Sequence, residues 1–104
     1  MIAELKDLSQ KVRDAEKGFP GEVAWIRYSI GHDWNGDPAI FFRVVLSDNA
    51  SQPKSLADVT GRIGSKLFDD LHLGDSDYTP YFYFRSKSEQ DQLKDPEWQS
   101  LTSC

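Results

Sequence analysis

The side chains that could bind a metal or move a proton are concentrated in two short segments that we predict to be loops. They are His32, Asp33 and Asp37 in the first segment and His72, Asp75 and Asp77 in the second. Imidazole nitrogens and carboxylate oxygens are metal ligands, so a metal site or an enzyme active site could form if the two loops met. Aspartate also commonly caps backbone N–H groups in turns. We adopt this second role, and we predict that His32, Asp33, Asp37 and His72 do not converge on a metal.

Covalent catalysis has no recognisable nucleophile in this sequence. No serine follows the pattern of a nucleophile elbow. The single cysteine, Cys104, is the last residue, so it has no cysteine partner within the chain and no obvious base to activate it. We assign no catalytic residue and no cofactor, and an enzyme or metal site that uses the His and Asp loops ranks third among the possible functions.

The segment Gly61-Arg62-Ile63-Gly64 resembles the GxxG loop of a KH domain, in which two glycines let the backbone approach nucleic-acid phosphates. The expected order of elements also resembles the α, β, β, α, α, β order of bacterial KH domains. A KH-like module that binds nucleic acid or another anion through Gly61 and Gly64 is therefore the alternative function.

A continuous helix explains the same segment better. Ile63 is in phase with the other members of an apolar stripe, which are Leu56, Val59, Leu67 and Leu71. In such a helix, Ala57, Gly61 and Gly64 form a strip of small residues that lets the helix approach large aromatic side chains. We predict that residues 55–73 form one helix without a break.

Composition describes an ordinary globular protein with an acidic surface. The 104 residues suit one domain, 1–104, and the 17 Asp and Glu against 12 Lys and Arg give a net charge of −5. This charge repels nucleic-acid phosphates and anionic lipids, so we expect neither partner. No segment approaches the roughly 20 apolar residues of a membrane span, and we expect a cytoplasmic protein.

The first predicted helix and hairpin supply most of the core. Apolar residues at helical spacing predict a helix over residues 2–17; they are Ile2, Leu5, Leu8, Val12 and Ala15. Residues 22–30 and 39–47 alternate as strands. One face of this hairpin is apolar, with Ala24, Ile26, Tyr28 and Ile30 beside Ile40, Phe42, Val44 and Leu46.

The parity of the two strands decides between two possible hairpin loops. A two-residue turn at Asn35-Gly36 would mix the two faces. A three-residue loop, Trp34-Asn35-Gly36, with Gly36 in the left-handed conformation, instead sets Tyr28 opposite Phe42 and Ile26 opposite Val44. We predict this second register.

The remaining elements complete an α+β fold of order α-β-β-α-β. Ser55 with Asp58 resembles a capping box for the second helix, and Gly74 is its expected end. Residues 81–86 form a third strand. Ser88 with Asp91 resembles a further cap, and Asp95-Pro96 opens a last helical turn. We expect a three-stranded sheet with two main helices packed on it and a short helical C-terminal tail.

Aromatic residues and arginines alternate with the core positions of all three predicted strands. This face carries Trp25, Arg27, Phe41, Arg43, Val45, Tyr81, Tyr83 and Arg85. Trp, Tyr and Arg are enriched in interface hot spots, although such aromatics could also stack on bases. The first helix, or the tail with Trp98, could alternatively cover the face. We predict a protein interface, most simply a homodimer, formed by Trp25, Arg27, Phe41, Arg43, Tyr81, Tyr83 and Arg85.

Two segments, GDPAIFFRVVLSD (36–48) and YFYFRSKSEQ (81–90), resemble small uncharacterised bacterial proteins, including those carried by mobile gene (integron) cassettes. The resemblance extends over about residues 22–98. It implies a compact cytoplasmic α+β protein of unassigned activity that is often an oligomer. It supplies no functional residue.

Overall fold

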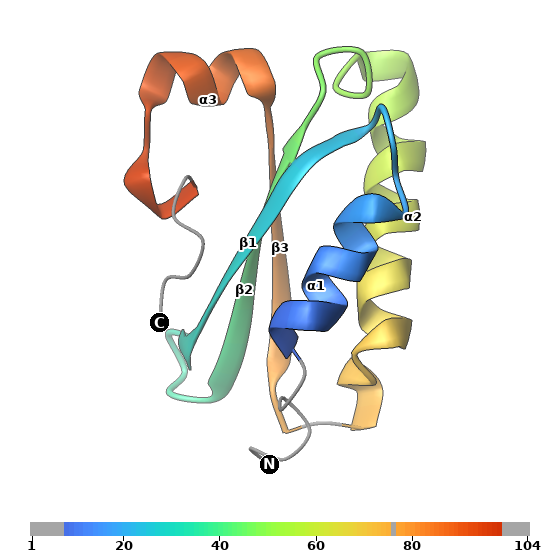
Figure 1. Cartoon of the computed structure of the whole chain (residues 1–104). Helices are drawn as coiled ribbons and strands as arrows, with labels where there is room; N and C mark the ends of the chain where they lie inside the picture. The colour runs from blue at the N-terminus through green and yellow to red at the C-terminus, as the bar shows by residue number, and fades with distance from the viewer. Residues whose placement is uncertain (1–7, 76, 99–104) are drawn as a thin grey trace.

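Three strands form a single open sheet in the computed structural model, which describes residues 8–75 and 77–98 (Figure 1). The elements are, in order, α1 (Leu8–Lys17), β1 (Val23–His32), β2 (Pro38–Leu46), α2 (Pro53–Asp70), the 3-10 turn η2 (Leu73–Asp75), β3 (Thr79–Ser86), α3 (Lys87–Leu93) and the 3-10 turn η3 (Pro96–Trp98). The predicted α+β class and element order are confirmed. Among the described residues, no helix is long and apolar enough to cross a membrane.

β2 is the central strand of the sheet. It pairs with β1 in an antiparallel hairpin and with β3 in parallel, and α2 forms the crossover between β2 and β3. α1 and α2 lie on one side of the sheet, here called the helix face (Figure 1). α3 and η3 lie on the other side, here called the second face. The sheet therefore has helical cover on both sides.

The hairpin has the predicted register and loop. Tyr28 lies opposite Phe42 and Ile26 lies opposite Val44. Gly36 has a φ of +85°, a left-handed conformation that costs glycine little, and its N–H donates to the Asp33 C=O over 2.9 Å. The three-residue loop between Asp33 and Asp37 is therefore confirmed.

A β-bulge near the start of β1 changes one predicted assignment. Val23 pairs with Leu46 and Trp25 pairs with Val45, so Ala24 is the extra residue. The bulge turns Val23 toward the core and leaves Ala24 exposed. The prediction that Ala24 lies on the apolar face was wrong because simple alternation has no place for an inserted residue.

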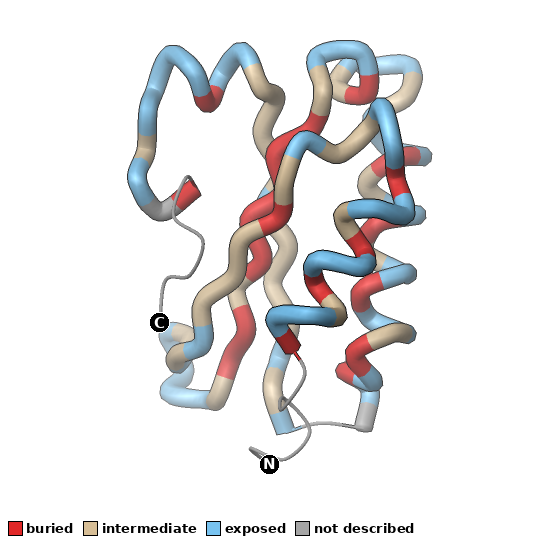
Figure 2. The backbone as a smooth tube through the Cα atoms, viewed as in Figure 1, coloured by how far each residue is buried: buried red, intermediate tan, exposed pale blue. Residues whose placement is uncertain are grey.

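The core lies between the helix face and the two main helices, as the buried segments in Figure 2 show. β2 supplies its centre, where Ile40, Phe42, Val44 and Leu46 are almost completely buried. The helices contribute the buried residues Leu8, Val12, Ala15, Val59, Ile63 and Leu67. The predicted contributions of Ile2 and Leu5 lie outside the described residues.

α2 is one unbroken helix, and Ile63 is completely buried within it. The predicted absence of a break is thus confirmed, but both predicted ends need correction. The helix begins at Pro53, whose fixed φ suits a first helical turn, so the Ser55 and Asp58 capping box is not used. It ends at Asp70, and His72, with a φ of 53°, adopts the left-handed conformation expected at Gly74.

The small residues of α2 do not pack on aromatic side chains as predicted. A Cβ atom added to Gly61 or Gly64 would meet nothing within 4 Å, and Ala57 is exposed. These residues lie outside the buried stripe, because they fall on a different side of the helix from Ile63. Among the residues that the structure describes, the small size of Gly61 and Gly64 therefore serves no close contact.

The cap of α3 lies two residues before the predicted one. The Ser86 hydroxyl accepts a hydrogen bond from the Glu89 N–H, which makes Ser86 the N-cap. Ser88, predicted as the cap, instead donates through its N–H and its hydroxyl to the Asp48 carboxylate. The local sequence offers two similar serines, and the position of β3 selects the first.

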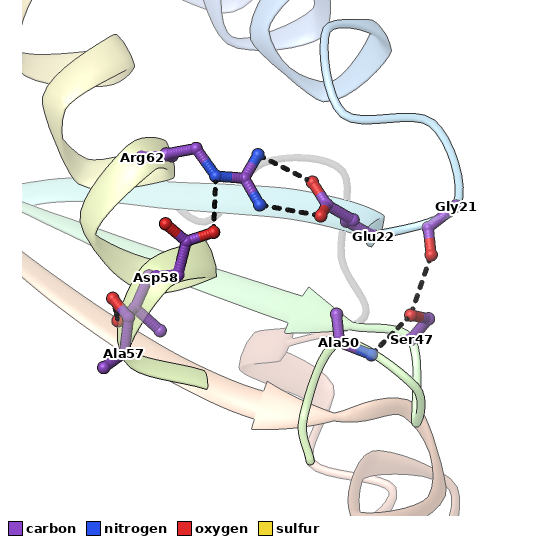
Figure 3. A network of polar contacts seen from close by, with 8 residues as sticks. Gly21, Glu22, Ser47, Ala50, Ala57, Asp58 and Arg62 are labelled. Carbon is purple, nitrogen blue, oxygen red and sulfur yellow. Dashed lines mark hydrogen bonds and ion pairs between the residues drawn. The ribbon is translucent and has the colours of Figure 1, made fainter. Parts of the chain in front are cut away.

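Polar contacts fasten α2 to the start of β1 (Figure 3). The Arg62 guanidinium donates two hydrogen bonds to Glu22, over 3.1 and 2.7 Å, and a third to Asp58 over 3.0 Å. These hydrogen bonds lower the pKa of Glu22 and raise that of Arg62. Nearby, the Ser47 hydroxyl donates to the Gly21 C=O over 2.9 Å and accepts from the Ala50 N–H over 3.1 Å.

Candidate association surface

The His and Asp residues considered as metal ligands are used differently in the fold. His32 ends β1, whereas His72 follows α2 and lies beside Asp69 and Asp70. Within the described part of the chain, no three His, Cys, Asp or Glu side chains gather as a metal site requires. The Asp75 side chain and Cys104 lie outside the described parts of the structure.

Asp33 caps the hairpin loop and ties it to β3. One carboxylate oxygen accepts the N–H groups of Asn35 and Asp37 over 2.9 and 3.0 Å, and the other accepts the Tyr81 hydroxyl over 2.9 Å. Partial burial raises the pKa of Asp33, but these hydrogen bonds outweigh it and the pKa is lowered overall. The hydrogen bond that the Tyr81 hydroxyl donates to Asp33 raises the pKa of Tyr81. Asp33 therefore positions an aromatic side chain.

The motif Gly61-Arg62-Ile63-Gly64 does not form a loop in this structure. Both glycines lie in the middle of α2, and Ile63 is buried. The Arg62 guanidinium, the cationic group of the motif, is held by Glu22 and Asp58. The backbone amides that a KH loop would direct at phosphates are hydrogen-bonded within the helix.

The predicted interface residues belong to the second face, as the strand register requires. They are Trp25, Arg27, Phe41, Arg43, Tyr81, Tyr83 and Arg85. Arg43 lies near the middle of this face and is buried. The others divide into two groups, because the C-terminal elements cover only one end of the face.

The covered end contains Trp25 and Arg85. The Trp25 indole N–H donates to the Trp98 C=O, and the Arg85 guanidinium lies 4.1 Å from the centre of the Trp98 ring. Arg85 also donates to Gln90, a completely buried residue of α3, over 2.8 Å. These side chains hold the chain's own tail, so they are not free for a partner. The alternative considered for this face, coverage by the tail with Trp98, applies at this end.

Arg27 is also engaged within the chain. Its guanidinium lies 3.4 Å from the Glu16 carboxylate of α1 and 5.6 Å from the centre of the Trp25 ring. Its exposed area is small, since the side chain is 15% exposed. Arg27 therefore links α1, β1 and the covered end of the second face.

The open end of the second face is an aromatic patch, defined here as Trp34, Phe41, Tyr81 and Tyr83. The Phe41 and Tyr81 rings stack with their centres 5.4 Å apart, and the centre of the Trp34 ring lies 5.7 Å from that of Tyr81. Trp34 is 80% exposed and Tyr83, in the middle of β3, is 45% exposed. Sequence reasoning missed Trp34 because it placed this residue in the loop and did not extend the face beyond the strands.

Comparison with known proteins adds no assignment. The sequence matches no protein-family model. A search of curated proteins finds no relative either. The resemblance to cassette-borne bacterial proteins therefore stays a prediction, and the surface must be interpreted from its own geometry.

Proposed function

We propose that this protein acts by association, and that its partner is a second copy of the chain bound at the aromatic patch around Tyr83. The observation that supports this proposal is the exposure of Tyr83 in the middle of an edge strand, beside the stacked rings of Phe41 and Tyr81. Monomeric proteins seldom leave neighbouring aromatic residues open on a sheet. An isologous contact would bring the same patch of both copies together.

One member of the patch, Tyr81, is already held in place by other side chains of the chain. Tyr81 is held between Phe41 and Trp34 and by its hydrogen bond to Asp33. Little side-chain entropy is therefore lost when a partner covers it. Each 100 Å² of apolar surface removed from water contributes roughly 2.5 kcal/mol. Association through this patch requires no cofactor, and a cytoplasmic location remains our expectation.

A pair of glutamate substitutions tests this proposal. Tyr83→Glu places a charge on the most exposed strand residue of the patch, and Leu93→Glu places the same charge on an exposed apolar residue of α3 outside it. We expect Tyr83→Glu to weaken dimerisation at least tenfold in sedimentation velocity, whereas Leu93→Glu should behave like the wild type. Circular dichroism should show both variants folded. Equal dimerisation by all three proteins would refute the role of the patch.

A further inference from the structure

Hydrogen bonding in the hairpin fixes the direction of the backbone groups on the central strand. The Asp33 N–H donates to the Asp37 C=O over 2.9 Å, so these residues are a hydrogen-bonded pair. Such pairs alternate along the hairpin with non-hydrogen-bonded pairs. Arg27 and Arg43, which lie opposite one another six residues away, are therefore also a pair joined by backbone hydrogen bonds. The backbone groups that point to β3 are therefore those of the intervening residues of β2, which are Ile40, Phe42 and Val44.

The same reasoning identifies the groups at the outer edge of β3. In a parallel pair, a residue bonds to the two residues that flank its partner on the next strand. Phe42 lies opposite Phe82 and so bonds to Tyr81 and Tyr83. The N–H and C=O groups of Phe82 and Phe84 consequently point away from the sheet. Among the described residues, none forms a hydrogen bond with these outward groups.

The opposite edge of the sheet is blocked at Ile26. The outward N–H of Ile26 in β1 donates to the Glu16 carboxylate over 2.6 Å, and the outward C=O of Ile26 accepts from Arg27 over 3.1 Å. Side chains of this kind protect sheet edges against strand pairing. Since β1 is protected at Ile26 and no described group protects Phe82 or Phe84, β3 is the more accessible edge for a further strand.

We propose that β3 pairs antiparallel with β3 of a second copy about a two-fold axis at Tyr83, which joins two sheets into one of six strands. This inference rests on the proposed function and specifies how the two copies meet. Phe82 of each copy would lie opposite Phe84 of the other, and the outward N–H and C=O groups of both residues would be paired. Tyr83 would lie opposite Tyr83 of the second copy.

The ends of β3 complement each other in this register. Pro80 and Ser86 would be opposite one another, and Pro80 has no N–H to donate. Ser86 is the N-cap of α3, so its C=O accepts the first hydrogen bond of that helix and needs no donor from a partner. The Ser86 N–H is left to donate to the Pro80 C=O of the second copy. No outward backbone group from Pro80 to Ser86 is left unpaired.

Neighbouring registers are less favourable. An axis at Phe82 would place Pro80 opposite Phe84, so the Phe84 C=O would lack a donor. An axis at Phe84 would extend the pairing into α3, where Ser88 is helical. With the axis at Tyr83, Arg85 lies opposite Tyr81 of the second copy, so the two Arg85 side chains, which hold the tail of their own chains, do not face one another.

Space beside the edge permits this pairing. A groove of about 830 Å³ lies between α2 and β3, and its lining includes Leu56, Thr60, Phe82 and Phe84. Leu56, on the side of α2 that lines this groove, is 39% exposed. α2 therefore does not close the edge against an incoming strand.

Amide hydrogen exchange followed by NMR tests the proposal on the wild-type protein. Above the dissociation constant, the Phe82 and Phe84 amides should be protected at least tenfold more than at the lowest measurable concentration. The Tyr83 amide, which points to β2, should change much less and serves as the control. A dimer in which Phe82 and Phe84 remain unprotected would overturn edge pairing while leaving the proposed function intact. A protein that stays monomeric would overturn both.

Cysteine cross-linking tests the register. In a Cys104→Ser background, Tyr83→Cys should form a disulfide-linked dimer on mild oxidation, because opposed residues of a non-hydrogen-bonded pair are about 4.5 Å apart at Cα. Thr79→Cys is the matched control, since it is exposed on the same strand but would be far from its own copy. Equal cross-linking at both positions, or cross-linking at Thr79 alone, would refute the axis at Tyr83.

Discussion

Asp33 is the residue on which the open end of the second face depends. Its carboxylate fixes both the hairpin loop and the Tyr81 ring through three hydrogen bonds. The loop half of this arrangement is predictable, because the parity of the strands selects the position of Gly36. The link to Tyr81 is not predictable, because the two residues are 48 positions apart and only the parallel pairing of β3 brings them together.

The pH dependence of Asp33 provides a test at this scale. Burial opposes ionisation, but the hydrogen bonds from Tyr81 and the loop prevail, so the pKa of Asp33 in the folded protein lies below its unfolded value of about 4. Its stabilisation is therefore complete above that value and is lost as pH falls through the folded pKa. NMR titration should show a higher carboxyl pKa in Tyr81→Phe than in the wild type. An unchanged titration midpoint would contradict this account.

The glycines of α2 test the continuity of that helix. Gly64 lies mid-helix with nothing within 4 Å of an added Cβ, so Gly64→Ala should raise the free energy of unfolding by about 1 kcal/mol. Gly36→Ala is the control, because the φ of +85° at Gly36 should make alanine destabilising. Urea denaturation measures both. If Gly64→Ala destabilised the protein, residues 61–64 would not be regular helix.

Element types follow from the sequence more readily than element ends. The apolar stripe of α2 and the alternation of the strands predicted both kinds of element, because each period reflects a buried side. The ends depend on competing local groups: Pro53 begins α2 before Ser55 can cap it, and Ser86 caps α3 because β3 extends to that residue. The bulge at Ala24 was not predictable from the alternation, because simple alternation has no place for an inserted residue.

Which parts of the two sheet faces are covered by helices and by the C-terminal tail depends on the whole molecule. Parity placed the aromatic and arginine residues on one face, but it could not show which of them the tail would cover. The contact between Trp25 and Trp98 spans 73 positions, and it removes one end of the predicted interface. The open aromatic patch and the free edge of β3 are what remains for a partner.

Net charge predicts how salt affects association. Each chain carries a charge of −5, so two copies repel one another and the attraction must come from apolar and backbone contacts. Raising the ionic strength screens this repulsion. We expect the dissociation constant of the dimer to decrease as the NaCl concentration is raised from about 50 to about 500 mM. Sedimentation velocity measures this change. Weaker association in high salt would indicate that opposite charges hold the copies together.

We propose that the aromatic patch around Tyr83 and the β3 edge hold two copies together in solution. The most direct measurement is sedimentation equilibrium of the wild-type protein over a wide range of concentration, from low to high micromolar. We predict that the mass rises from 11.8 kDa to twice that value. A constant mass of 11.8 kDa at the highest concentration would contradict the claim.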